Sequence, residues 1–139
     1  MREILFRAKA INRDPDFNYR SNYKNGDWVY GLITKLYNEK YDIPAEMVDT
    51  SGISGIEVDC NTTGESTGLK DKNGKLIFEG DVVDVDNALL SGRFWVEYGM
   101  SGAFIVKDKD DRRYFLGGCN CTVVGNAYDN PELLEEERE

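Results

Sequence analysis

Short runs in which apolar and polar residues alternate are the dominant pattern of the sequence. Ile4, Phe6 and Ala8 alternate with mainly polar neighbours, and Ile56-Glu57-Val58-Asp59-Cys60 does the same. A period of two predicts strands with one buried face. Similar runs occur at residues 27–33, 76–78, 82–86, 94–98, 103–106, 114–116 and 121–127. Turn signals separate these runs roughly every 8–12 residues, which favours an all-β barrel or sandwich.

Two Asn-Gly pairs mark the expected hairpins. Asn25-Gly26 precedes the run at 27–33, and Asn73-Gly74 precedes Leu76-Ile77-Phe78. Both residues of such a pair tolerate a positive φ, so we expect a type I′ turn at Asn25-Gly26. Gly74 is expected to have a positive φ at the tip of the second hairpin.

Three stretches depart from the strand pattern. Residues 34–55 space Tyr37, Tyr41 and Ile43 irregularly, and a short helix is possible near residues 44–48. Residues 61–66 are polar and predict a loop. Asn130-Pro131 suits the N-cap and first position of a short C-terminal helix.

The length of 139 residues is that of one domain. We expect a single mostly-β domain over residues 1–128, in which residues 80–128 form a small SH3-like barrel preceded by additional N-terminal strands and a hairpin. Residues 129–139 are expected to form a short acidic helix or tail, since they hold six acids and one base.

The net charge of −9 argues against direct binding to nucleic acid or to an anionic membrane surface. The apolar runs are too short to span a bilayer, and the N-terminus lacks a signal-peptide core. Three cysteines, Cys60, Cys119 and Cys121, are a poor disulfide framework. We therefore expect a cytoplasmic protein.

Four segments, taken in order, resemble one known family. The block Thr67-Gly-Leu-Lys-Asp-Lys-Asn-Gly-Lys75, followed by Ile77-Phe-Glu-Gly-Asp-Val-Val83, resembles the signature of YopX proteins. Met1–Ala8, Gly26–Gly31 and Val123–Leu134 resemble the family's opening, its G-x-W-V-Y-G element and its ending. The resemblance covers essentially the whole chain.

This resemblance implies an all-β fold of SH3-barrel type and a phage or prophage origin. It implies no activity, and no catalytic residue can be carried over. The lead-in Thr62-Thr-Gly-Glu-Ser-Thr-Gly68 departs from the family by lacking its valine and its aromatic residue.

The sequence contains no histidine, which removes the commonest general base and metal ligand. Glu79, Asp81, Asp84 and Asp86 could bind a hard cation, but alternation explains Asp84 and Asp86 as the solvent face of a strand whose Val83 and Val85 are core. Cys119 and Cys121 share a strand face, yet too few further soft ligands exist, and small buried side chains are the simpler interpretation. No cofactor and no metal are expected.

Lysines and aromatic residues offer two further candidate surfaces. Lys70, Lys72 and Lys75 surround Asp71 at a hairpin tip, where they could contact a phosphate or an acidic partner or could simply be solvated. Aromatic strand residues could line a peptide groove or belong to the core: Trp28, Tyr30, Trp95, Tyr98 and Phe104.

Three functions remain open. The leading hypothesis is a non-enzymatic interaction or assembly module that contacts a protein partner or a second copy of itself through sheet edges and hairpins. The alternatives are an acidic mimic of nucleic acid that blocks a DNA-binding protein, and a carboxylate- or metal-dependent enzyme. Backbone geometry and packing leave five polar residues unexplained, and these form the predicted contact surface: Thr67, Lys70, Asp71, Glu79 and Asp81.

Overall fold

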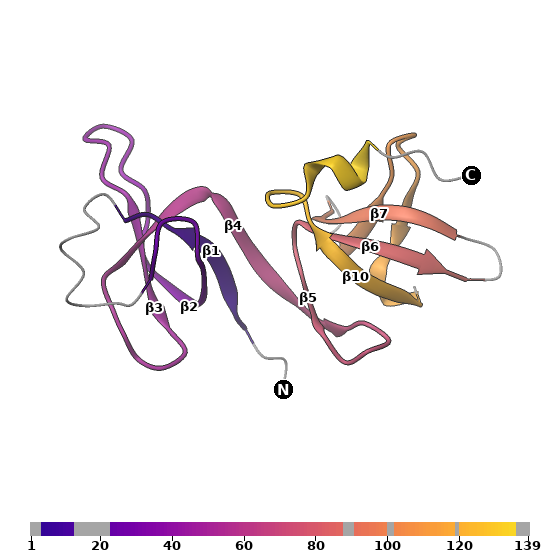
Figure 1. Ribbon diagram of the computed structural model, residues 1–139, viewed down its shortest axis with the longest axis horizontal. Helices are drawn as coiled ribbons and strands as arrows, with labels where there is room; N and C mark the ends of the chain where they lie inside the picture. Colours follow the sequence, from indigo (N-terminus) through magenta and orange to yellow (C-terminus); the bar gives the residue numbers. More distant parts are fainter. Residues whose placement is uncertain (1–3, 13–22, 88–90, 100–101, 119, 136–139) are drawn as a thin grey trace. The chain divides into compact units, whose positions relative to one another are not determined.

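The computed structural model describes residues 4–12, 23–87, 91–99, 102–118 and 120–135, and it consists mainly of strands joined by turns (Figure 1). The strands are β1 (Phe6–Ala10), β2 (Trp28–Lys35), β3 (Ala45–Asp49), β4 (Ile56–Lys70), β5 (Leu76–Phe78), β6 (Asp81–Asp86), β7 (Ser91–Tyr98), β8 (Phe104–Lys107), β9 (Arg113–Phe115) and β10 (Cys121–Asn126). Two 3₁₀ turns, η1 (Leu116–Gly118) and η2 (Pro131–Leu134), complete the described elements. All strand pairings are antiparallel, and the predicted all-β class is confirmed.

The chain divides into two compact units, an N-terminal unit of Glu3–Glu65 and a C-terminal unit of Ser66–Glu139. Strand β4 supplies residues to both units. The single domain predicted for residues 1–128 stays a prediction. It would be tested by whether tryptophan fluorescence and circular dichroism report one unfolding transition.

The N-terminal unit is a small barrel. Strand β1 pairs with both β2 and β4, while β3 pairs with β2 and β4, so the four strands close on themselves. Closure leaves these strands without an open sheet edge. Alternate residues fill the interior: Ala8, Ala10, Val29, Ala45, Met47, Ile56 and Val58.

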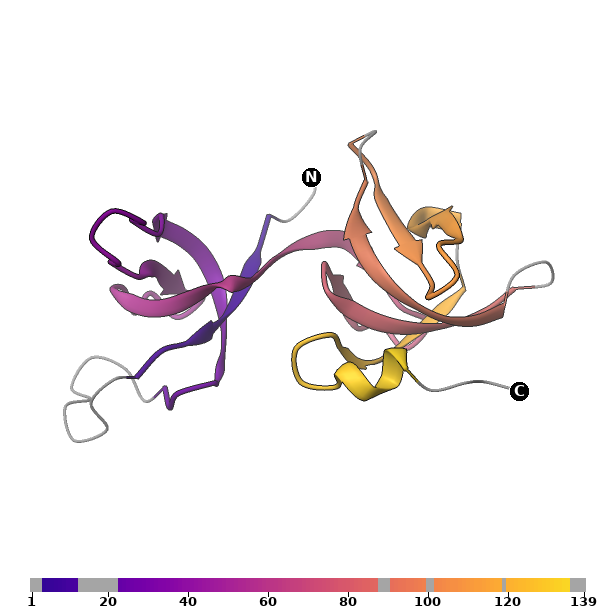
Figure 2. The same ribbon diagram turned by 90° about the horizontal axis from the view of Figure 1, so that it is seen from above.

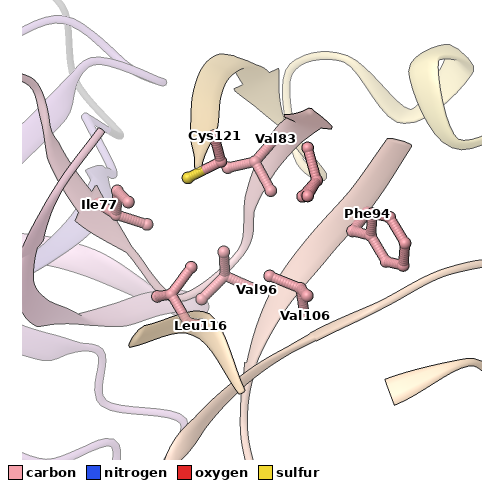
Figure 3. Close-up of a cluster of buried hydrophobic side chains, with 8 residues drawn as sticks. Ile77, Val83, Phe94, Val96, Val106, Leu116 and Cys121 are labelled. Carbon is pink, nitrogen blue, oxygen red and sulfur yellow. The ribbon is translucent and has the colours of Figure 1, made fainter. Parts of the chain in front are cut away.

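The C-terminal unit is a five-stranded sheet in the order β10-β6-β7-β8-β9. Its core is the cluster drawn in Figure 3: Ile77, Val83, Val85, Phe94, Val96, Val106, Leu116 and Cys121. Turn η2 follows β10 and packs against β7 (Figure 2). In chain order β6 is the first strand of this sheet and β10 the last, and these two strands pair with each other. This order is compatible with the SH3-like barrel, which stays a prediction.

Two local predictions, the short helix near residues 44–48 and the loop at residues 61–66, were wrong. Residues 45–49 form β3 and no helix, since Ala45, Met47 and Asp49 alternate as its buried side. Pro44 stands just before this strand, where its missing N–H is not needed for pairing. Residues 61–66 continue β4, because small polar side chains such as Thr62 and Ser66 occupy buried positions.

The turn type predicted at Asn25-Gly26 was also wrong. At Asn25-Gly26 only the glycine has a positive φ, of 91°, and the Asp27 N–H donates to the Lys24 carbonyl at 3.0 Å. One left-handed residue excludes type I′, which requires two. At the other end of the chain, Pro131 begins η2 as predicted, but Asn130 makes no side-chain cap.

Three hairpin loops share one five-residue arrangement headed by an aspartate. In each, the aspartate N–H donates to the carbonyl four residues on, and its Oδ1 accepts N–H groups two and four residues on. The fourth residue has a positive φ, between 65° and 94°. The loops are Asp49–Ile53, Asp71–Lys75 and Asp108–Arg112. A type I turn followed by a left-handed residue has this form.

Gly74→Ala is expected to lower the free energy of unfolding by about 1–2 kcal/mol. Gly74 has a φ of 83°, and nothing lies within 4 Å of the position that a Cβ would occupy. The expected loss is therefore backbone strain alone. Chemical denaturation measures it, with Gly117→Ala as the control, because Gly117 has equal space and no positive φ. Equal stability of the two variants would contradict the assignment.

Candidate interaction surface

The five predicted contact residues separate into buried and accessible groups. Thr67, Asp71 and Asp81 are buried, whereas Lys70 is exposed and Glu79 is half-buried. The Thr67 hydroxyl donates to the Ile77 carbonyl at 2.8 Å. The structure therefore gives three of the five residues a local structural role, and their role in a contact stays a prediction.

Asp71 holds its hairpin in place through both carboxylate oxygens. Oδ1 accepts the N–H groups of Asn73 and Lys75 at 2.9 Å each, and Oδ2 accepts the N–H of Val123 in β10 at 3.0 Å. The Lys72 N–H also donates to the Cys121 carbonyl at 3.0 Å. Burial by itself raises the pKa of Asp71, but the N–H groups of Val123, Lys75 and Asn73 outweigh it and hold the pKa below its usual value.

The acidic residues near β6 do not converge. Asp81 is 1% exposed and accepts the Phe78 N–H at 2.8 Å, while Asp84 pairs with Arg93 at 2.9 Å. Asp86 is exposed on the side of β6 opposite the core, as alternation predicted. Within the described ranges, no group of three or more His, Cys, Asp or Glu side chains could hold a metal ion.

Burial of Cys121 agrees with the simpler interpretation of that cysteine, while the role of the three lysines stays a prediction. Cys121 lies in the hydrophobic core, Cys60 is half-buried, and Cys119 lies outside the described residues. Lys72 and Lys75 are exposed in the hairpin loop, like Lys70.

The five aromatic candidates occupy different units. Trp28 and Tyr30 belong to the N-terminal unit, where the Arg7 guanidinium lies 4.7 Å from the Trp28 ring centroid. In the C-terminal unit Tyr98 and Phe104 meet edge to face at 5.2 Å, and the Trp95 Nε1 donates to Glu97. The peptide groove that these residues were proposed to line stays a prediction.

A set of exposed apolar side chains lies on β2 and on the loop that joins it to β3. We call it the hairpin surface, and it consists of Tyr30, Leu32, Leu36, Tyr37, Tyr41 and Ile43. Leu36 is 78% exposed and Tyr41 is 65% exposed. All six lie within residues 30–43, and a concentration of exposed apolar residues is more typical of a contact site than single ones scattered over a surface.

Local geometry explains why these side chains face outward. Val29 and Gly31 are buried in the barrel, so Tyr30 and Leu32 point to its outer face. In the loop, Asn38 and Ile43 exchange two backbone hydrogen bonds, at 2.9 and 3.1 Å.

A hydrogen bond from the Tyr41 N–H to the Asn38 side chain and the left-handed residue Asp42 define the turn at the loop tip. The Asn38 Oδ1 accepts the N–H of Tyr41 at 3.2 Å. Asp42 follows with a φ of 50°, a conformation that Asp and Asn tolerate better than most residues. These contacts give the tip a defined backbone while leaving its apolar side chains exposed.

An open pocket of about 320 Å³ lies beside this loop in the N-terminal unit. It is lined by Ile11, Tyr37, Asp42, Pro44, Val58, Asp59, Cys60 and Asn61. The Tyr37 hydroxyl donates to Asp42 Oδ1 at 2.9 Å. This hydrogen bond is the main cause that raises the pKa of Tyr37.

Sequence reasoning missed both the hairpin surface and the pocket. The available signal was the irregular spacing of Tyr37, Tyr41 and Ile43. Large apolar residues that fit neither the helical nor the strand period cannot all be placed on one core face. Such residues are therefore candidates for exposure.

No helix in the part of the chain that the structure describes is long and apolar enough to cross a membrane.

Comparisons with known proteins identify the family of the chain. No curated protein matches it. Protein EF1440 from Enterococcus faecalis has a similar crystal structure, with a TM-score of 0.55 and 24% identity over 96% of this chain and 99% of that one. At this identity the likeness concerns the fold alone. The family model for YopX protein matches residues 7–135, nearly the full length. The chain therefore belongs to the YopX family, as its sequence motifs indicated.

Proposed function

We propose that this protein is a non-enzymatic interaction or assembly module, and that the hairpin surface is its contact site. The observation that carries the proposal is the grouping of six exposed apolar side chains within residues 30–43. Aromatic residues are enriched among the side chains that dominate binding energy at protein interfaces, and this surface contains three tyrosines. The module acts for a phage or prophage in the cytoplasm of a bacterial host.

Two further observations support an interaction role over catalysis. The sequence has no histidine, so the commonest general base is missing. The shared loops use both oxygens of Asp71, and of Asp49, to hold backbone or side-chain donors, so these carboxylates serve the fold.

The double variant Leu36→Ser/Tyr41→Ser is expected to lose the partner. Both side chains are largely exposed, so the fold should tolerate the change. Truncation of residues at the centre of an interface weakens binding by about 2 kcal/mol or more. That is a loss of roughly thirtyfold or more in affinity. Affinity capture from a lysogenic or infected host, followed by titration of the captured protein, measures the loss, and light scattering measures self-association.

The control is Ile4→Ser/Leu69→Ser, which removes two exposed apolar side chains outside the hairpin surface. Circular dichroism confirms that both variants fold. If Leu36→Ser/Tyr41→Ser captures the same proteins as the wild type and has the same mass in solution, the proposal is wrong.

A further inference from the structure

We propose that the pocket beside the hairpin surface receives an arginine side chain of the partner, an inference that rests on the proposed function and specifies the partner's chemistry. The residues that line the pocket include two acids, Asp42 and Asp59, and Tyr37, and none of the lining residues is a lysine or arginine. Its volume of about 320 Å³ lies at the small end of the range of ligand sites, about 300–1,000 Å³. That size suits one side chain better than a large cofactor.

The two carboxylates retain accepting capacity. Asp42 uses Oδ1 for the Tyr37 hydroxyl, and Asp59 uses Oδ1 for the N–H of Asn61 at 3.0 Å. Among the described residues neither Oδ2 accepts a hydrogen bond, and neither carboxylate has an ion-pair partner. A cation in the pocket would therefore meet two negative charges without displacing an existing cation.

The remaining lining suits the rest of an arginine side chain. Half-buried Ile11 offers apolar surface to its methylene stem, whereas Pro44 and Val58 are themselves buried and belong to the wall of the pocket. The Tyr37 ring offers a face on which a guanidinium can stack. A guanidinium is planar, is more weakly hydrated than an ammonium and donates in a fork that matches carboxylates, so arginine suits the pocket better than lysine.

The charge of the whole chain acts in the same direction. With a net charge of −9 the protein attracts cationic partners at long range, which raises association rates. The hairpin surface would supply apolar contact beside the pocket, because Tyr37 belongs to both. The partner segment we infer therefore carries an arginine flanked by apolar residues.

The probe is the peptide acetyl-Leu-Ser-Arg-Ser-Leu-amide, compared with the same peptide carrying neutral citrulline in place of arginine. Titration of the isotope-labelled full chain is followed by amide chemical shifts. We expect the arginine peptide to shift the amides of Tyr37, Asp42 and Asp59, and the citrulline peptide to bind about tenfold more weakly or worse. Binding should also weaken with added salt.

The variant Asp42→Asn/Asp59→Asn should weaken the arginine peptide by a similar factor. Asparagine keeps the Oδ1 acceptor for Asn61 and tolerates the positive φ at Asp42, so the loop geometry is preserved. The control Glu57→Gln/Glu132→Gln removes two exposed charges elsewhere and should bind as the wild type does.

Absence of binding by the arginine peptide at millimolar concentration, or equal binding of both peptides, overturns the pocket assignment. So does wild-type capture of the partner by Asp42→Asn/Asp59→Asn when Leu36→Ser/Tyr41→Ser has lost it, and this result leaves the proposed function standing. If Leu36→Ser/Tyr41→Ser retains the partner, the proposed function fails, and the pocket's role in it fails too.

Discussion

Asp71→Ala is expected to lower the free energy of unfolding by about 2–4 kcal/mol at neutral pH. Asp71 is 7% exposed, and its carboxylate accepts three backbone N–H groups, two in its own loop and one in β10. Water can reach the N–H groups of the exposed residues Asn73 and Lys75 after truncation. The N–H of Val123 lies in a partly buried pairing, so the loss of its acceptor accounts for much of the cost.

Chemical denaturation of Asp71→Ala, Asp71→Asn and Asp86→Ala separates the contributions. Asparagine keeps Oδ1 for the loop but places either an oxygen or an NH₂ group, not a charge, opposite Val123, so an intermediate loss is expected. Asp86 is exposed on β6, and its truncation should change stability by no more than about 0.5 kcal/mol. An Asp71→Ala variant as stable as Asp86→Ala would show that the hairpin does not depend on this carboxylate.

The pH dependence gives Asp71 a second signature. The pKa of Asp71 is lowered in the folded protein, so the unfolded chain binds the proton more tightly and protonation favours unfolding. Its contribution is fully present above the unfolded pKa of about 3.9 and is lost as the pH falls through the lower folded pKa. The stability difference between the wild type and Asp71→Ala should therefore be constant near neutral pH and shrink below about pH 4.

The strands of this protein could be predicted because most of them bury one face. Val83 and Val85 lie in the core while Asp84 and Asp86 do not, as the alternation of β6 indicates. The continuation of β4 through residues 61–66 could not be predicted, because these residues are polar and a polar run suggests a loop. Thr62 is buried in this strand because its hydroxyl donates to the Asp59 carbonyl and accepts the Lys9 N–H. A polar residue with such partners can be buried, and composition alone does not reveal the partners.

The candidate site illustrates a different limit of sequence reasoning. Asp71 was selected because backbone geometry did not account for it, yet the structure shows that it organises the backbone. A usable signal existed, since Asp49-Thr-Ser-Gly52 and Asp71-Lys-Asn-Gly74 share an aspartate three residues before a glycine. Asp108 escapes that pattern, because Asp111 takes the left-handed position with a φ of 65°.

The hairpin surface and pocket depend on contacts that are not regular. Asp42 and Asp59 are 17 positions apart by their numbers and line the same pocket because β3 and β4 pair, with Ala45 opposite Val58. Strand register of this kind follows from the closed barrel as a whole. It could not be derived from residues 34–55, whose pattern predicted neither helix nor strand clearly.

Phe94→Ala is expected to lower the free energy of unfolding by about 3–5 kcal/mol. Phe94 has no exposed surface and lies in the core of the C-terminal unit with Val83 and Val96 (Figure 3). The ring also meets Tyr114 edge to face at a centroid distance of 6.1 Å, and the Arg112 guanidinium lies 5.7 Å from its centroid. Truncation therefore removes buried apolar area, leaves a cavity and takes away both ring contacts.

The matched control is Phe115→Ala, which removes the same side chain from a position that is 66% exposed in the same unit. Its cost should be below about 1 kcal/mol, because little apolar area leaves water there on folding. Phe94→Leu should fall between the two, since leucine refills part of the cavity but offers no ring to Tyr114 or Arg112. If Phe94→Ala and Phe115→Ala unfold at the same denaturant concentration, Phe94 does not anchor this core.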